Sequence, residues 1–343
     1  MSAGPRFGPE ARVELAHGAG GRTMHALIAD LFERHLTNPA LERGEDAAVL
    51  PAPGARLAVT TDGYVIDPLF FPGGDIGALA VHGTVNDLAV MGARPLWLTA
   101  GFILEEGFSL RDLDEIVASM AAAATAAGVA VVSGDTKVVE RGKGDGVFIT
   151  TAGVGALPDG VALGTDRIAP GDAVVVSGTV GDHGVAVLSK RSGLAFETEI
   201  RSDSAALHGL VAAMLAAVPE LHALRDPTRG GVAATLNEIA HARGVAISLR
   251  EAALPVKPAV NGACELLGLD PLHVANEGKL LAFCPAARAD DLVAAMRAHP
   301  LGRDAAVVGQ VAAEPRGLVE LATGFGGTRV VDWLAGEQLP RIC

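Results

Sequence analysis

The sequence predicts a mixed α/β protein of two domains. Apolar, strand-like runs alternate with segments of helical periodicity in both halves of the chain, which is typical of α/β folds. The length of 343 residues suits about two domains. A connector at residues 159–170, with Pro, Gly and few large apolar residues, divides them. We therefore expect a segment at 1–42, an N-terminal domain at 43–158, a C-terminal domain at 171–323 and a flexible tail at 324–343.

Composition excludes several classes of function. The chain has 27 Lys and Arg against 40 Asp and Glu, so its net charge of −13 opposes broad binding to nucleic acid or to an anionic membrane. Three cysteines do not make a disulfide framework. The first fifteen residues lack the apolar stretch of a signal peptide, and Gly128 divides the uncharged stretch 116–134. We expect a cytoplasmic protein without a membrane span.

In the N-terminal half, the elements follow from apolar periodicity and its interruptions. An amphipathic helix is expected near Met24–His35, and a second helix at Asp75–Met91, which Gly92 ends. A capping box that begins at Ser109 starts a third helix. Apolar runs predict strands at residues 55–61, 95–104, 129–133 and 147–155.

The C-terminal half repeats this style. Strands are predicted at residues 172–178, 245–251, 279–285, 305–312 and 317–323. Helices are predicted at His183–Arg191, Ser204–Val218, Gly231–Arg243, around 260–267, and at Asp290–His299. The stretches AVVSGD and VVVSGTVGD resemble each other weakly, which fits either two related domains or a chance likeness of strand–turn segments.

Acidic residues in the N-terminal half indicate a metal–phosphate site. The sequence has neither a P-loop nor a Rossmann glycine motif, so phosphates would need another means of binding. Asp46 lies in GEDAAVL, Asp62 and Asp135 follow strands, and Asp87 lies inside a predicted helix. Mg²⁺ prefers a few carboxylates together with phosphate oxygens. The alternative is that each Asp is a turn or cap residue, which suits Asp87 poorly.

Further candidates lie near these acids or in the second half. Lys137 follows the strand at 129–133 and is either a phosphate or proton-transfer group or a solvated charge. Asn86 precedes Asp87 in the helix and is a candidate for nucleotide binding. Glu277 lies in NEGK, before an apolar strand, as a base or a turn acid. The stretch DPTRGG at 226–231 opens a helix, as an anion-binding corner or an ordinary turn.

The three cysteines fall into two groups. Cys264 lies in a predicted helix and Cys284 in a predicted strand, so both are expected to be core thiols. Cys343 is the last residue, on a tail that contains Gly and Pro. A thiolate is a nucleophile that can carry an acyl group, so a functional role explains an exposed terminal thiol better than packing does. The alternative is a terminal cysteine without a function.

Long stretches of the sequence resemble the HypE family of hydrogenase maturation factors. The match extends over essentially the whole chain and includes the terminal PRIC. The similar stretches are HGAGGRTMHALI, GEDAAVL, YVIDPLFFPGGDIGALAVHGTVNDLAVMGA, GFILEEG, VSGDTKVVERGKGDG, GTVGDHG, DPTRGGVAATLNEIA, ALPVKPAV, NEGKL and PRIC. Glu45 departs from the family pattern, which has Asp there more often, while Asp46 is retained.

The resemblance implies a fold like that of aminoimidazole ribonucleotide synthetase and selenophosphate synthetase, with the N-terminal sheets pairing in a homodimer. Pairing would also cover the edges of apolar strands such as RLAVTT and FITTAGVG. The resemblance also implies that the carbamoyltransferase HypF loads a carbamoyl group onto Cys343, that ATP phosphorylates the carbamoyl oxygen, and that a thiocyanate forms. The cyanide then passes to iron on a HypC–HypD scaffold.

In that reaction, two N–H protons must leave, so Glu277 and Lys137 are the expected acid–base residues. The expected Mg²⁺ ligands are Asp46, Asp62, Asp87 and Asp135, and nucleotide binding adds Asn86 and Lys137. Two rivals remain. Selenophosphate synthetases carry a reactive cysteine or selenocysteine in the N-terminal Gly-rich segment, which HGAGGRTMHAL lacks. A carrier that only presents a thiol would not need the acidic residues.

Overall fold

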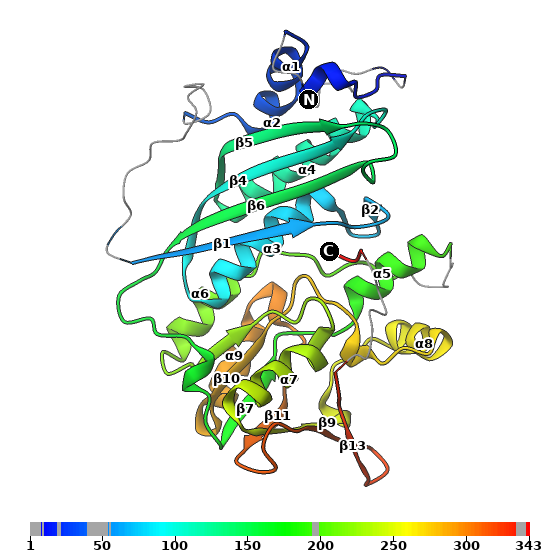
Figure 1. The fold of residues 1–343 in the computed structure, drawn as a ribbon. Helices are drawn as coiled ribbons and strands as arrows, with labels where there is room; N and C mark the ends of the chain where they lie inside the picture. The colour runs from blue at the N-terminus through cyan, green and yellow to red at the C-terminus, as the bar shows by residue number, and fades with distance from the viewer. Residues whose placement is uncertain are drawn as a thin grey trace.

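Two domains are stacked on each other in the computed structural model (Figure 1), and the C-terminus lies between them. The structure describes residues 8, 10–18, 22–39, 54, 56–193, 199–333 and 341–343. Within these ranges, every helix is too short or too polar to cross a membrane.

A four-stranded sheet forms the N-terminal domain. Its strands run in the order β1 (Leu57–Tyr64), β6 (Val147–Ala156), β4 (Arg94–Glu105) and β5 (Ala130–Val139). Strands β4 and β5 are parallel because a helix connects them, and the other two pairs are antiparallel. A short hairpin of β2 (Phe70–Phe71) and β3 (Gly74–Asp75) lies at the edge.

Two helices cover one face of this sheet, as predicted. Helix α3 (Ile76–Val90) begins after Asp75, whose carboxylate accepts hydrogen bonds from the first-turn amides. Helix α4 (Leu110–Ala127) begins after Ser109, whose hydroxyl oxygen accepts from the amide of Asp112, so the predicted cap is present. Both helices carry buried apolar residues onto the sheet.

The other face of the N-terminal sheet is open, as Figure 1 shows for the described part of the chain. Alternate strand residues point to it, among them Leu57, Val59 and Ile103, and the Val59 side chain is 69% exposed. An apolar sheet face of this kind indicates a surface that another molecule covers.

The N-terminal segment packs onto β4. The predicted amphipathic helix is present as successive helical turns, in which Phe32 lies 5.0 Å from Phe102, measured between ring centroids. These turns are η1 (Leu15–Gly18), α1 (Arg22–Leu27), η2 (Ile28–Glu33) and α2 (Arg34–Leu36).

A seven-stranded sheet forms the C-terminal domain. All its pairs are antiparallel except β12 with β9. The order is β13 (Thr328–Val330), β12 (Val319–Ala322), β9 (Ala246–Arg250), β11 (Ala306–Ala312), β7 (Asp172–Val176), β10 (Leu281–Pro285) and β8 (Ala223–Arg225).

Helices pack on both faces of this second sheet. Helices α6 and α9 share one apolar core, which includes Cys284, and α7 packs into another. Short 3-10 turns lie at Thr165–Arg167, Glu251–Ala253, Pro271–His273, Ala286–Arg288 and Pro300–Gly302. The helices are α5 (Asp182–Arg191), α6 (His208–Ala217), α7 (Gly231–Arg243), α8 (Pro258–Leu267) and α9 (Ala289–Ala298).

The last part of the chain contains one short strand. Residues 328–330 form β13 against β12, because backbone groups there complete the sheet ladder. The expected flexible tail at 324–343 stays a prediction. The end of the tail, at 341–343, lies against the segment after β1, where Ile342 pairs with Ile66. The structure therefore holds the last residues between the domains.

Candidate functional site

A cleft of about 790 Å³ lies between the domains. Strand β1 and helix α3 form one wall, and the segments around residues 163–166 and 224–229 form the other. Its side chains of chemical interest are Asp62, Asp87, Asp226, Arg229, Glu277 and Cys343. The cleft thus brings together four of the residues expected from the sequence.

Asp87 is an acid of this cleft with a defined hydrogen bond and a raised pKa. It projects from α3, and its Oδ2 accepts a hydrogen bond of 2.8 Å from the Thr60 hydroxyl of β1. Burial raises the pKa of Asp87 to about 6, and the charges of Asp226 and Asp62 add to the rise. Burial also raises the pKa of Asp226. Buried acids with a raised pKa in a cleft are typical of cation or proton-transfer sites.

Glu277 is almost completely buried at the floor of the cleft. Among the described residues, its Oε1 has no hydrogen-bond partner. Burial raises the pKa of Glu277 well above its usual range, and the charges of Asp203, Asp226 and Asp62 raise it further. A carboxylate with this environment is a stronger base than an exposed one, and its open oxygen points to an absent partner.

The backbone of Glu277 is held from two sides. Its N–H donates to Asp203 Oδ1 at 3.1 Å, and its carbonyl accepts from Asn86 Nδ2 at 3.2 Å. The next residue must be Gly278, because a Cβ there would lie 1.7 Å from the Asp203 carbonyl oxygen. The Asn86 side chain also donates to the Ala205 carbonyl at 3.0 Å.

Asn86 therefore lies behind the site. Its Oδ1 accepts from the Leu207 amide at 2.8 Å, so each of these three hydrogen bonds joins the Asn86 side chain to a backbone group of the C-terminal domain. These contacts tie α3 to the segment that carries Glu277, which indicates a positioning role. Nucleotide binding by Asn86 stays a prediction.

The C-terminal tripeptide 341–343 reaches this cleft. The Val65 amide donates to the Cys343 carbonyl at 3.0 Å, and the Asp67 amide donates to the Arg341 carbonyl at 3.2 Å. Ile342 is buried between these contacts. Cys343 itself is half-buried and lines the cleft with Glu277. By contrast, Cys264 and Cys284 are buried in the core, as predicted.

Asp135 and Lys137 do not reach the cleft of their own chain. They pair with each other at 3.0 Å on β5, where both side chains are more than 60% exposed. Strands β6 and β4 separate β5 from β1, and the register places Lys137 opposite Ile103, on the open face. Local periodicity predicts each strand but not this order. The expected roles of Asp135 and Lys137 stay predictions.

The metal site expected from four Asp residues is only partly assembled. Asp62 and Asp87 lie in the cleft, Asp135 lies elsewhere, and Asp46 is outside the described residues. In the part of the chain that the structure describes, no three His, Cys, Asp or Glu side chains lie close enough together to hold an ion by themselves. Phosphate oxygens would have to complete the coordination.

Asp226 and Arg229 lie in DPTRGG, the stretch that the sequence predicts as an anion-binding corner or an ordinary turn, and both line the cleft before α7. The sequence does not single out Tyr64 and Asp203. Tyr64 is buried beside Asp62, with its hydroxyl 3.1 Å from Thr84 Oγ1. Asp203 lies in a stretch without a recognisable motif, and only the tertiary fold of the C-terminal domain brings it to Glu277.

Comparisons with known proteins identify the family. Models of the AIR synthase related protein match the chain at residues 44–157 for the N-terminal domain and at 169–321 for the C-terminal domain. The chain is also 63% identical to the carbamoyl dehydratase HypE of Azotobacter vinelandii over 331 residues. This alignment covers 96% of this chain and 97% of that protein. The chain belongs to the HypE family. The predicted family, mixed α/β fold and enzyme class are confirmed.

Two solved HypE structures are similar to this one. A crystal structure of the hydrogenase maturation protein HypE in complex with ATP has a TM-score of 0.92 at 50% identity, covering 96% of this chain and 99% of that one. HypE in a HypE–HypF complex has a TM-score of 0.79 at 48% identity, covering 90% and 99%.

Proposed function

We propose that the chain uses ATP to dehydrate an S-carbamoyl group on its own Cys343 to a thiocyanate, which supplies cyanide ligands for [NiFe]-hydrogenase iron. The main support for this proposal is that the terminal Cys343 lies in one cleft with Asp62, Asp87 and Glu277. The relatives named carbamoyl dehydratase HypE support the reaction class. The solved HypE complex with ATP supports the nucleotide.

The reaction balances in two steps. The carbamoyl oxygen attacks the terminal phosphorus of ATP, ADP leaves, and one N–H proton is lost, which gives an S-bound imidate phosphate. The C–O bond then breaks, phosphate leaves with the second N–H proton, and a C≡N triple bond remains on the sulfur. Phosphorylation is needed because an amide oxygen is a poor leaving group, and phosphate is a good one.

The residues of the cleft suit these steps. Glu277 takes a proton from the carbamoyl nitrogen, because its buried carboxylate binds protons more tightly than an exposed one. Asp62 and Asp87 would hold Mg²⁺, a role supported by the raised pKa of Asp87, to which burial contributes most and the neighbouring charges of Asp226 and Asp62 add. Bound there, Mg²⁺ would neutralise phosphate charge. Arg229 lies where a phosphate could meet the start of α7.

Asp87→Asn tests the nucleotide site. Loss of one carboxylate is expected to raise the dissociation constant of Mg–ATP about tenfold, which corresponds to about 1.4 kcal/mol. Calorimetry gives the constant, and Asp304→Asn, an exposed acid far from the cleft, is the matched control. An unchanged affinity for Asp87→Asn would remove Asp87 from the nucleotide site.

Asp87→Asn is expected to weaken nucleotide binding but to stabilise the protein when metal and nucleotide are absent. The pKa of Asp87 is raised to about 6, so the folded state binds a proton that the unfolded state releases. This stabilisation is complete below about pH 4 and is lost as the pH rises through about 6. Asp87→Asn should remove this pH dependence and raise the free energy of unfolding at pH 7 by about 1–3 kcal/mol. Urea titrations at pH 5 and 7 measure the free energy of unfolding and its pH dependence. If this free energy changed with pH equally in wild type and variant, the raised pKa would not belong to Asp87.

A homodimer is the second part of the proposal. The open face of the N-terminal sheet carries Val59 and Ile103, and a second copy would cover it. Asp135 and Lys137 lie on this face, so dimerisation would carry them toward the partner subunit. Their expected roles in ATP binding and proton transfer would then be exerted across the interface.

Val59→Asp tests the dimer. A charge at this apolar position would be buried without a partner, so the dissociation constant of the dimer is expected to rise about 100-fold or more. Light scattering across a dilution series measures it. The control is Val330→Asp, at a valine on β13 of the other domain that is 58% exposed. A wild-type monomer, or a variant that dimerises like wild type, would reject this interface.

The remaining partners rest on the family. The solved HypE–HypF complex supports HypF as the protein that loads Cys343. Delivery to a HypC–HypD scaffold and a cytoplasmic location stay predictions.

A further inference from the structure

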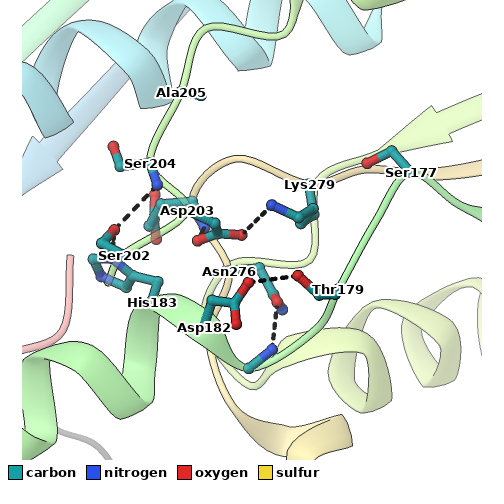
Figure 2. Close-up of polar contacts among 12 residues, drawn as sticks. Ser177, Thr179, Asp182, His183, Ser202, Asp203, Ser204, Ala205, Asn276 and Lys279 are labelled. Atoms are coloured by element: carbon teal, nitrogen blue, oxygen red, sulfur yellow. Dashed lines mark hydrogen bonds and ion pairs between the residues drawn. The ribbon is translucent and has the colours of Figure 1, made fainter. Parts of the chain in front are cut away.

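His183 joins the C-terminal domain to the docked tail. It lies on α5 with no exposed surface. Its Nε2 lies 2.8 Å from the Ile342 carbonyl oxygen, and its Nδ1 lies 2.8 Å from Ser202 Oγ. Figure 2 shows the imidazole beside Ser202, which is linked in turn to Ser204. None of the steps above uses this residue.

The hydrogen bonds define one tautomer of this ring. A carbonyl oxygen only accepts, so Nε2 must carry the hydrogen that the Ile342 carbonyl receives. Burial lowers the pKa of His183, so the ring is neutral near pH 7 and Nδ1 is an acceptor. The Ser202 hydroxyl therefore donates to Nδ1, while its oxygen accepts from the Ser204 amide at 3.1 Å. The chain of donors runs from Ser204 through Ser202 and His183 to the tail.

The imidazole and its serine are both fixed by the N-terminal domain. The ring meets Phe71 edge-on, with centroids 5.4 Å apart and planes at 89°. The Ser202 amide donates to the Pro72 carbonyl at 2.7 Å. Gly73 permits this approach, because a Cβ there would lie 2.8 Å from the Ser202 nitrogen. A ring held in this way presents its N–H at one place.

Each carbonyl of the tripeptide has a donor. The Arg341 carbonyl accepts from the Asp67 amide and from Arg191 Nη2, and the Cys343 carbonyl accepts from the Val65 amide. The middle carbonyl, of Ile342, accepts from His183. Backbone of the N-terminal domain and side chains of the C-terminal domain thus hold the peptide from both sides.

We infer that His183 is a positioning residue for the dehydration: its Nε2–H binds the Ile342 carbonyl and fixes where Cys343 enters the cleft, with Ser202 setting the tautomer. The inference rests on the proposed function for its catalytic meaning. Its structural content, that His183 controls docking of the tail, is independent of that chemistry. A histidine that only fills the core would affect stability and leave the tail unchanged.

The test is the rate at which iodoacetamide alkylates Cys343, followed by mass spectrometry of the C-terminal peptide in the full-length protein. His183→Leu removes the donor, and His183→Gln retains an amide N–H near the position of Nε2. We expect alkylation of Cys343 about fivefold faster in His183→Leu, the effect of one lost neutral hydrogen bond, and a rate near wild type in His183→Gln. Buried Cys264 and Cys284, whose pKa values burial raises to about 11, report unfolding in the same sample.

Ser202→Ala keeps the inference testable if His183→Leu unfolds. It removes only the hydroxyl that sets the tautomer, and alkylation about two- to threefold faster is expected. Wild-type alkylation rates in both Ser202→Ala and a folded His183→Leu would overturn the inference, as would a folded His183→Gln that behaves like His183→Leu. If Ser202→Ala is the only one of these two that folds, its rate alone decides.

Turnover then separates this inference from the proposed function. In carbamoylated protein at saturating ATP, thiocyanate formation by His183→Leu should fall about fivefold, with ATP affinity unchanged, and His183→Gln should restore it. If alkylation changes as expected but wild type forms no thiocyanate, the proposed function fails and the positioning role of His183 stands. If wild type forms thiocyanate and the His183→Leu tail is as protected as in wild type, only the inference about His183 fails.

Discussion

Cys343→Ala should abolish thiocyanate formation completely, whereas ATP binding and dimerisation should survive. The variant lacks the sulfur that is proposed to carry the carbamoyl group, and the other two thiols are buried in the core with raised pKa values. The docked tripeptide is held through its backbone carbonyls, so Ala at the last position should still dock. Mass spectrometry of the C-terminal peptide, before and after addition of ATP to the carbamoylated protein, detects the loss of water.

Two controls sharpen this experiment. Cys343→Ser retains the size and polarity of the side chain but not the thiolate, so it should fail equally. Cys264→Ala should form thiocyanate at a rate near wild type, because that thiol is buried in α8. Cyanide-ligated iron formed with Cys343→Ala, or a modification found on Cys264 or Cys284, would show that the proposed mechanism is wrong.

Glu277→Gln should lower the rate of dehydration about 100-fold or more, the typical effect of losing a general base. Gln retains the size of the side chain, and Asn86 and Asp203 hold the backbone of this residue, so the turn should keep its shape. ATP affinity and Cys343 alkylation should therefore stay near wild type. Single-turnover kinetics of the carbamoylated protein measure the rate.

The pH profile distinguishes a base from a structural acid. The pKa of Glu277 is raised by burial, and only its carboxylate accepts a proton. The wild-type rate should therefore rise as the pH increases through this raised pKa, and Glu277→Gln should lose that rise. The exposed Glu265→Gln is the matched control. A Glu277→Gln rate within threefold of wild type, or an unchanged profile, would exclude Glu277 as the base.

The sequence predicts those site residues that local patterns single out. An Asp inside an apolar helix, such as Asp87, conflicts with its surroundings, and a cysteine at the last position, such as Cys343, lies outside every helix and strand that the sequence predicts. Both lie in the cleft. The helix start at Ser109 also follows from short-range hydrogen bonding, which the local sequence encodes.

Long-range placement explains what the sequence did not predict. Both Asp62 and Asp135 are predicted to follow strands and lie within β1 and β5 instead, and the strand order β1-β6-β4-β5 places them at opposite edges of the sheet. Local periodicity carries no information about that order. Asp203 meets Glu277 and His183 meets Ile342 only in the folded chain, across long separations in sequence, so their neighbours in the chain give no signal for these contacts.

Docking of the chain's own end has a kinetic consequence. In the proposed reaction the substrate is attached to Cys343 of the same chain, so the cleft would meet it at an effective concentration set by the tether and not by the solution. Dehydration would then be a first-order event, unaffected by dilution, while loading and unloading remain encounters between two molecules. Each subunit would dehydrate one carbamoyl group per loading of Cys343. The rate of cyanide supply would therefore depend on the concentrations of the proteins that load and unload this residue.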